Sequence, residues 1–184
     1  MPLKNVENIE ICNYVIRNWR KEDAASIVQY ASNRKIWINL RDAFPHPYTM
    51  ADAEAFLLRA MQMKSGAFFA IASDTEAIGS IGLMAGIDVH RFTAELGYWL
   101  AEPFWGKGIM TAAVRALSEY AFAELGFHRI FAEPCTANSA SARVLEKAGF
   151  ALEGIMRSSV FKDGRILDQY LYAKVDERAQ QKDR

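Results

Sequence analysis

The sequence predicts an α/β (α+β) domain built around one twisted, mostly antiparallel sheet flanked by helices. Three observations predict this class: short apolar runs with strand alternation, helical segments between those runs, and an Asp163-Gly164 pair that signals a closing hairpin. The chain has 184 residues, of which 51% are hydrophobic and 24% charged, as in a soluble globular protein. We therefore expect a single domain over residues 1–184, with a charged tail from about residue 176.

The N-terminal part is predicted to hold a strand, a helix and an ordered loop. Residues 9–19 have strand character, and Asp23 is placed to cap a helix that runs to Asn33. Two prolines then hold residues 39–49 in an extended conformation. We expect this segment to be an ordered surface loop.

A helix and a hairpin are predicted next. Thr49 starts a helix whose apolar stripe consists of Ala53, Phe56, Leu57 and Ala60. Residues 67–72 and 77–83 form two strands that are joined by a polar turn. Gly79 and Gly82 indicate bulges or close packing in the second of these strands.

The segment 95–111 is the centre of the predicted fold. Its first half has strand spacing, in which two sets alternate: Leu96, Tyr98 and Leu100 with Glu95, Gly97 and Trp99. Pro103 ends this strand, and Gly106 and Gly108 form a loop. Apolar residues with helical spacing follow as far as Leu125. The order is strand, glycine loop, helix.

The C-terminal part repeats the alternation of strand and helix. Residues 128–132 form a strand, and Asn138 or Ser139 caps a helix that ends at Gly149. The last two strands pair across the Asp-Gly turn.

The glycine loop before the central helix has the properties of an anion site. A helix begins with unpaired N–H groups at the positive end of its dipole, and glycines let a ligand approach that backbone. Phosphate is the natural ligand, although glycines also serve a tight turn between packed elements. A Walker loop does not fit, because Gly108 follows Lys107 where Ser or Thr is required, and the dinucleotide fingerprint lacks its third glycine.

Two motifs resemble the GNAT superfamily of N-acetyltransferases, in its RimJ/RimL-like branch. The first is Gly97-Tyr-Trp-Leu100 followed by Phe104-Trp-Gly-Lys-Gly108 and Thr111, and the second is Asn138-Ser-Ala-Ser141 with Val144-Leu-Glu-Lys-Ala-Gly-Phe150. The resemblance implies acetyl-CoA as co-substrate and a sheet that splays apart between the strands at 93–100 and 128–132. Pro103 departs from the superfamily pattern, in which Gln or Arg is frequent, and this removes one phosphate contact.

The resemblance also implies which residues contact coenzyme A. These are Trp99, Leu100, Gly106, Lys107, Gly108, Ile109, Met110, Thr111, Asn138 and Ser141. By the same resemblance, Ser141 is the candidate acid that protonates the coenzyme A thiolate. Asn138 and Ser141 are also good helix-start residues that satisfy N–H groups without any catalytic role. Backbone N–H groups near Trp99 and Leu100 are the candidate oxyanion donors.

Glu95 is the candidate general base, because it is the best-placed carboxylate on the central strand and shares a face with Gly97 and Trp99. The alternative is that Glu95 pairs with Arg91 or another cation. In RimL-like enzymes a glutamate on the penultimate strand is the proposed base, but this chain has Val160 at the best-aligned position. Other candidates for the base are therefore Glu153, His46 and a chain of waters.

The acceptor is expected to be a primary amine, either a protein N-terminal α-amine or a small molecule, because α-amines are partly neutral at cellular pH. Trp37, Arg41, Phe44 and Tyr48 are predicted to line its site, although aromatic residues beside prolines also pin a loop onto the core. Two alternatives stay open: a non-catalytic coenzyme A binding module, and an enzyme that uses another acyl-CoA such as succinyl-CoA.

Charge and cysteine content limit the partners and the compartment. Lys plus Arg equal Asp plus Glu, 22 against 22, so the chain lacks the basic excess of a nucleic-acid binder. Two cysteines are too few for a disulfide framework and lack metal-ligand spacing, which indicates the cytoplasm and no metal. No segment is apolar enough to span a membrane, and the protein is expected to be a monomer or a homodimer.

Overall fold

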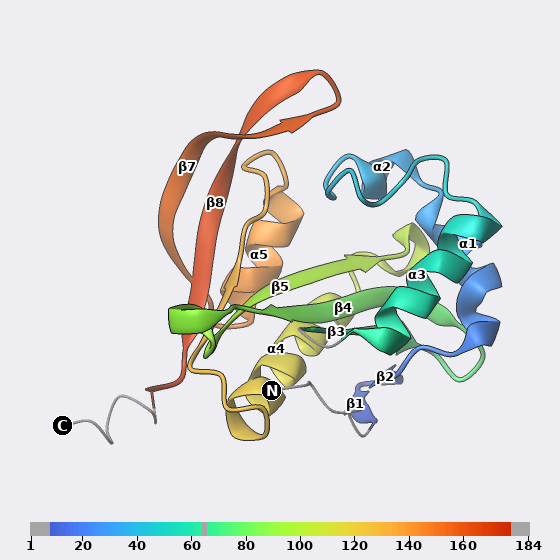
Figure 1. The fold of residues 1–184 in the computed structure, drawn as a ribbon, viewed down its shortest axis with the longest axis horizontal. Helices are drawn as coiled ribbons and strands as arrows, with labels where there is room; N and C mark the ends of the chain where they lie inside the picture. Colours follow the sequence, from blue (N-terminus) through green and yellow to red (C-terminus); the bar gives the residue numbers. More distant parts are fainter. Residues whose placement is uncertain (1–7, 64–65, 178–184) are drawn as a thin grey trace.

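The computed structural model describes residues 8–63 and 66–177, and within them one eight-stranded sheet organises the chain (Figure 1). The strand order is β1-β2-β3-β4-β5-β6-β8-β7, and the β5–β6 pair is parallel whereas the other neighbours are antiparallel. This confirms the predicted fold class. The strands are β1 (Ile9–Ile11), β2 (Tyr14–Arg17), β3 (Gly66–Ala72), β4 (Ala77–Ala85), β5 (Thr93–Leu100), β6 (Arg129–Ala132), β7 (Ala151–Lys162) and β8 (Arg165–Val175).

Helices cover both faces of the sheet. One face packs against α4 (Ile109–Ala123) and α5 (Ser139–Lys147), whose Leu117 and Leu145 are fully buried. The other face packs against α1 (Ala24–Ala31) and α3 (Met50–Gln62). The short elements are α2 (Arg34–Trp37) and the 3₁₀ turns η1 (Lys21–Asp23), η2 (Asp88–His90) and η3 (Glu102–Phe104). In the described part of the chain, no helix is both long and apolar enough to cross a membrane.

Several predicted boundaries are confirmed because short-range signals set them. Thr49 caps α3 in a capping box with Asp52, and the Asn138 side chain caps α5. The turn between β7 and β8 uses Asp163 at φ 51° and Gly164 at φ 75°, the left-handed pair that a tight hairpin needs.

Two N-terminal predictions are wrong in detail. Residues 9–19 do not form one strand, because Cys12 adopts φ 55° and the chain turns back to pair β2 with β1. The first helix does not run to Asn33 but ends at Ala31, and Asn33 instead caps α2 through its side chain.

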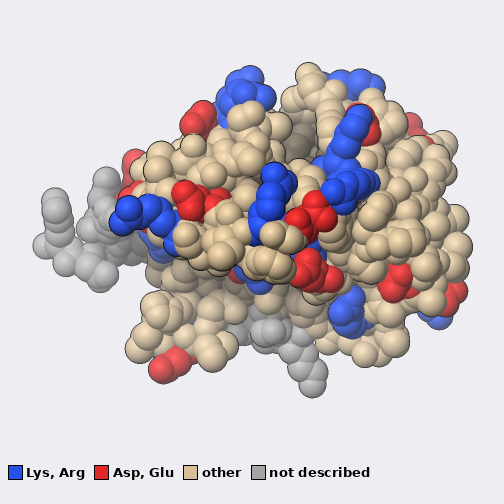
Figure 2. Space-filling model, turned by 90° about the horizontal axis from the view of Figure 1, so that it is seen from above, with Lys and Arg blue, Asp and Glu red and all other residues tan. Residues whose placement is uncertain are grey.

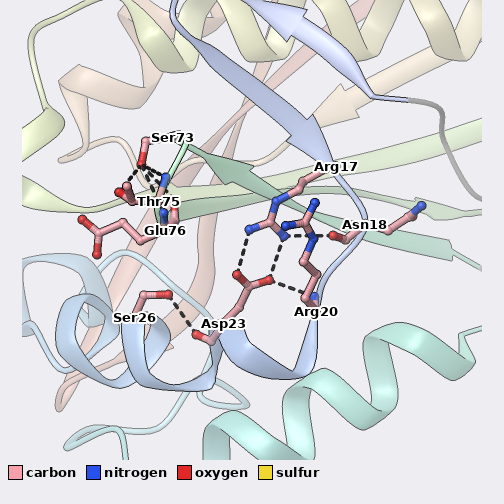
Figure 3. A network of polar contacts seen from close by, with 8 residues as sticks. All are labelled: Arg17, Asn18, Arg20, Asp23, Ser26, Ser73, Thr75 and Glu76. Atoms are coloured by element: carbon pink, nitrogen blue, oxygen red, sulfur yellow. Dashed lines mark hydrogen bonds and ion pairs between the residues drawn. The ribbon is translucent and has the colours of Figure 1, made fainter.

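Asp23 stands at the N-cap position of α1 but does not cap it (Figure 3). Its two carboxylate oxygens accept hydrogen bonds from the Arg17 guanidinium, each at 2.8 Å, and one oxygen also accepts from the Arg20 amide at 2.8 Å. Both charged side chains are buried, with side-chain exposures of 8% and 6%. The ion pair thus ties the end of β2 to the start of α1.

Close packing explains the glycines of β4. A Cβ atom on Gly79 would lie 2.5 Å from the Trp99 carbonyl oxygen, and one on Gly82 would lie 2.3 Å from the Phe68 ring. Any larger residue at these positions would push β3 and β5 away from β4. The glycines therefore fix the position of β5, the strand that carries the site.

Candidate active site

The sheet opens between β5 and β6. These strands pair only at Thr93 with Arg129, Ala94 with Ile130 and Glu95 with Phe131. The rest of β5, from Leu96 to Leu100, has β4 as a partner on one side and no ladder partner on the β6 side within the described residues. Backbone groups on this edge are available to an extended ligand.

The start of α4 lies beyond the open end of β5. Gly108 is the N-cap at φ 77°, and it has no side chain to accept from the first amides of the helix, those of Ile109, Met110 and Thr111. Gly106 also has a positive φ of 75°, and no atom lies within 4 Å of a Cβ built on either glycine. The loop thus presents amides at a helix start with open space in front, as an anion such as a diphosphate requires.

Two side chains hold this loop in place. The Trp105 indole N–H donates to the Leu100 carbonyl at 2.7 Å, which joins the loop to the end of β5. The Lys107 ammonium lies 5.3 Å from the centre of the Phe104 ring. Lys107 is exposed at the rim of the loop, where it can add a point charge to the amides.

Tyr98 and Ser141 meet on the α4–α5 side of the opening. Their hydroxyl oxygens are 2.8 Å apart, and the Ser141 amide donates to the Asn138 side chain at 3.1 Å. Burial raises the pKa of Tyr98 to about 12, although the Ser141 hydrogen bond opposes the shift. Tyr98 therefore stays protonated at neutral pH, where its hydroxyl can donate and accept hydrogen bonds and pass a proton along them.

The other face of β5 carries Glu95, Gly97 and Trp99. Arg41 forms an ion pair with Glu95 at 2.5 Å, and the centres of the Trp99 and Phe44 rings lie 6.0 Å apart in an edge-on arrangement. Between these two contacts, no atom lies within 4 Å of a Cβ built on Gly97. The surface over Gly97 is therefore open, with the charged Arg41–Glu95 pair on one side of it and the aromatic rings of Trp99 and Phe44 on the other.

Glu133 adds a second carboxylate at this end of the opening. It follows β6 directly, and burial together with the charge of Glu95 raises its pKa, whereas Arg41 lowers it. Glu95, Arg41 and Glu133 thus form one electrostatic group although they come from β5, a loop and the end of β6.

The tip of the β7–β8 hairpin leans toward α2 (Figure 1). Lys162 is only 4% exposed; its ammonium lies 2.8 Å from an Asp42 oxygen and 3.9 Å from the centre of the Trp37 ring. Arg34 pairs with Asp163 at 2.7 Å. Figure 2, which looks onto the molecule from above, shows positive and negative side chains next to one another on this face.

The structure brings most of the predicted site residues around the opening, with some corrections. Glu95 pairs with a cation, as the alternative reading expected, but the cation is Arg41 and not Arg91, which donates to the Asp88 carbonyl. Glu153 is held by Arg129 at 2.5 Å, and this ion pair lowers its pKa, so Glu153 is a poor base. Tyr48 is 5% exposed and packs on Phe44, which fits the loop-pinning alternative.

Sequence reasoning missed Tyr98, Glu133 and Lys162 as members of the site. The alternation of β5 already separated Tyr98 from Glu95, but the partner of Tyr98 on α5 is 43 residues away. Glu133 has the weak signal of a carboxylate directly after a strand. Lys162 has none, because a lysine beside a turn is normally solvated.

Comparison with known proteins identifies the family of the chain. The family described as "Acetyltransferase (GNAT) domain" matches residues 13–151, and this chain belongs to that family. The chain is 47% identical over 102 residues to the "Probable N-acetyltransferase YjcK" of Bacillus subtilis, covering 55% of this chain and 56% of the relative. The chain thus spans little more than half the length of that relative.

Two further comparisons agree with this family. The ribosomal-protein-serine acetyltransferase of Escherichia coli is 36% identical over 108 residues, which cover 58% of this chain and 59% of that enzyme. The structure of RimL, a ribosomal L7/L12 α-N-protein acetyltransferase in complex with coenzyme A, superimposes with a TM-score of 0.82 over 92% of this chain and 98% of that one. At 23% identity, that likeness shows the fold alone.

Proposed function

We propose that this protein is an acetyl-CoA dependent N-acetyltransferase that acts on a primary amine. The opening between β5 and β6 is the observation that carries the proposal, because it connects an amide-presenting helix start to a face with two carboxylates. Acetyl-CoA would supply an activated acetyl thioester. The residues predicted to bind it, from Gly106 to Thr111, surround the open space that its diphosphate needs.

The residues around the opening divide the work between the two faces of β5. On the α4–α5 face, Ser141 and Tyr98 are placed to donate a hydrogen bond and then a proton to the departing thiolate. On the other face, the acceptor would lie over Gly97, and a carboxylate would take the proton of its ammonium. Glu95 is the carboxylate that the sequence suggests.

A thiol-release assay tests the proposal. The purified chain is incubated with acetyl-CoA and a panel of peptides with free N-terminal serine or alanine and of small primary amines. We expect thiol release that depends on the amine, and an acetylated product by mass spectrometry. Binding of coenzyme A without release for any acceptor would indicate a binding module, and faster release from succinyl-CoA would indicate another acyl donor.

Replacement of Tyr98 by phenylalanine should lower kcat by about 10-fold to 100-fold, because Ser141 loses its hydroxyl partner, while acetyl-CoA affinity stays unchanged. Steady-state kinetics with the best amine of the panel measure this effect. Tyr172→Phe is the matched control, since the Tyr172 hydroxyl also contacts α5 but donates to Glu146, at 2.8 Å, and not to Ser141. Equal kcat values for the two variants would remove Tyr98 from the site.

Replacement of Gly97 by valine should narrow the acceptor site. The new side chain would project into open space, so folding and acetyl-CoA binding should persist while KM for the amine rises by about 10-fold or more. Gly154→Val is the matched control, because Gly154 also lies in a strand with open space at its Cβ position but on β7. An unchanged KM in Gly97→Val would show that the acceptor binds elsewhere.

The finer details of the function remain predictions. A relative named as a ribosomal-protein-serine acetyltransferase supports a protein as acceptor, and the aromatic side chains of Trp99 and Phe44 also suit a small amine. A cytoplasmic location and a monomeric or homodimeric state are expectations from the sequence. The elution volume in size-exclusion chromatography measures the oligomeric state directly.

A further inference from the structure

Two carboxylates stand on the acceptor face of the opening, one on each side of it. Glu95 is the register partner of Phe131 in the parallel β5–β6 pair, so their side chains point to the same face. Glu133 is two residues after Phe131 and continues that face, while Ile130 and Ala132 point into the core under α4 and α5. The electrostatic effect of Glu95 on Glu133 agrees with this placement.

The two carboxylates differ in their partners. Glu95 is held by Arg41 at 2.5 Å, so its charge is already compensated. Within residues 8–63 and 66–177, the Glu133 carboxylate makes no hydrogen bond and no ion pair. A base works best when its charge is not already compensated by a cation, and of these two carboxylates only Glu133 forms no ion pair among the described residues.

The backbone around Glu133 is nevertheless fixed. The Gln169 side chain donates to the Glu133 carbonyl at 2.7 Å, and the Tyr170 amide donates to the Pro134 carbonyl at 2.9 Å. β8 thus holds the segment after β6 beside the opening. The free carboxylate is therefore presented from a rigid support, as a catalytic group requires.

The surroundings of Glu133 raise its pKa. Burial raises the pKa of Glu133 first, the negative charge of Glu95 raises it further, and the positive charge of Arg41 lowers it. From β8 the facing side chain is the neutral Gln169, and the nearby Cys135 thiol has a raised pKa because it is buried. The positive charge of Lys162 lowers the pKa of Cys135, and Lys162 is itself paired with Asp42. A carboxylate with a raised pKa suits a general base better than an ordinary one.

We propose that Glu133 is the general base of the reaction, and that the Arg41–Glu95 ion pair is the positioning group beside it. This inference rests on the proposed N-acetyltransferase function. A Glu133 oxygen accepts one proton from the acceptor ammonium. The neutral nitrogen then forms a bond to the thioester carbon, the carbon–sulfur bond breaks, and the second nitrogen proton goes to the thiolate by way of the Ser141 and Tyr98 hydroxyls. Glu133 finally releases its proton to water.

The test compares Glu133→Gln with Glu95→Gln by the pH dependence of kcat/KM, using the amine of the panel that the wild type acetylates fastest. In Glu133→Gln, kcat/KM should fall by about 100-fold. The fall of kcat/KM at low pH should then reflect only protonation of the amine, because the contribution from protonation of Glu133 is lost. In Glu95→Gln, kcat/KM should fall by a smaller factor than in Glu133→Gln, and the acid-side decline should remain. Calorimetric titration with coenzyme A should give the same affinity for both variants and the wild type.

The position of the acid-side decline gives a second readout, which a merely structural role would not move. Activity requires ionised Glu133, so it falls as pH drops through the pKa of this group. Loss of the Glu95 charge lowers that pKa, so the decline in Glu95→Gln should move to lower pH. Loss of the Arg41 charge raises it, so the decline in Arg41→Gln should move to higher pH. Because the amine is the same throughout, its own ionisation cancels in the comparison.

The outcomes separate the two proposals. If the wild type acetylates an amine and Glu133→Gln is equally active while Glu95→Gln is inactive, Glu95 is the base and this inference is wrong, but the proposed function stands. If the wild type releases no thiol with any amine, both proposals are overturned. Folding of Glu133→Gln is checked by its melting temperature. This should equal or exceed that of the wild type at pH 7, because a raised pKa means that the folded state favours the neutral group.

Discussion

Replacement of Gly106 by glutamate is expected to lower the affinity for acetyl-CoA by about 1000-fold. The new carboxylate would stand in the open space before the α4 amides and repel the diphosphate. Loss of two charge-assisted hydrogen bonds, at about 1.5–3 kcal/mol each, already accounts for a change of this size. Isothermal titration calorimetry with coenzyme A measures the effect.

The control for this variant is Gly126→Glu. Gly126 has a positive φ of 71° and open space at its Cβ position, so glutamate there carries the same backbone strain and the same charge. Gly126 follows the end of α4, however, whereas Gly106 precedes its start. Unchanged coenzyme A affinity in Gly126→Glu together with lost affinity in Gly106→Glu assigns the effect to the loop. Equal affinity in the two variants would contradict the binding of the diphosphate by the loop from Gly106 to Thr111.

Replacement of Arg17 by methionine is expected to destabilise the fold more than any substitution of a surface ion pair. Asp23 would keep the hydrogen bond from the Arg20 amide but lose both hydrogen bonds from the Arg17 guanidinium (Figure 3). Its buried negative charge would then be uncompensated. Breaking a buried pair in this way costs about 3–5 kcal/mol, or roughly 6–20 °C in melting temperature for a domain of this size. Differential scanning calorimetry at pH 7 measures it.

Arg34→Met is the matched control for Arg17→Met. Arg34 also pairs with an aspartate, Asp163, but its side chain is 61% exposed, against 8% for Arg17. Water and salt screen such a pair, so the melting temperature of Arg34→Met should stay close to that of the wild type. Similar melting temperatures for the two variants would show that Asp23 finds another partner when Arg17 is lost.

The elements that the sequence predicted correctly are those with local signals. The capping box at Thr49, the loop from Gly106 to Gly108 and the Asp163-Gly164 turn each act over a few residues, so the sequence alone defines them. The break of the first strand at Cys12 was missed because no local signal marks it. A left-handed cysteine has no preference that a sequence reveals, and only the pairing of β1 with β2 requires it there.

The site was predicted in part, and the limit was the distance along the chain. The co-substrate loop lies within one motif, whereas the acceptor side is assembled from segments that meet only in the folded protein. Arg41 reaches Glu95 across 54 residues, and Lys162 reaches Asp42 across 120. Glu133 joins them because β6 lies parallel to β5, a pairing that no local pattern announces.

The most direct test of the whole account is a crystal structure of the chain with coenzyme A. We expect the diphosphate to accept hydrogen bonds from the backbone amides between Gly106 and Thr111, the pantetheine arm to run along the open edge of β5, and the sulfur to end near Tyr98 and Ser141. Coenzyme A bound at any other place, with the opening between β5 and β6 left empty, would contradict the account.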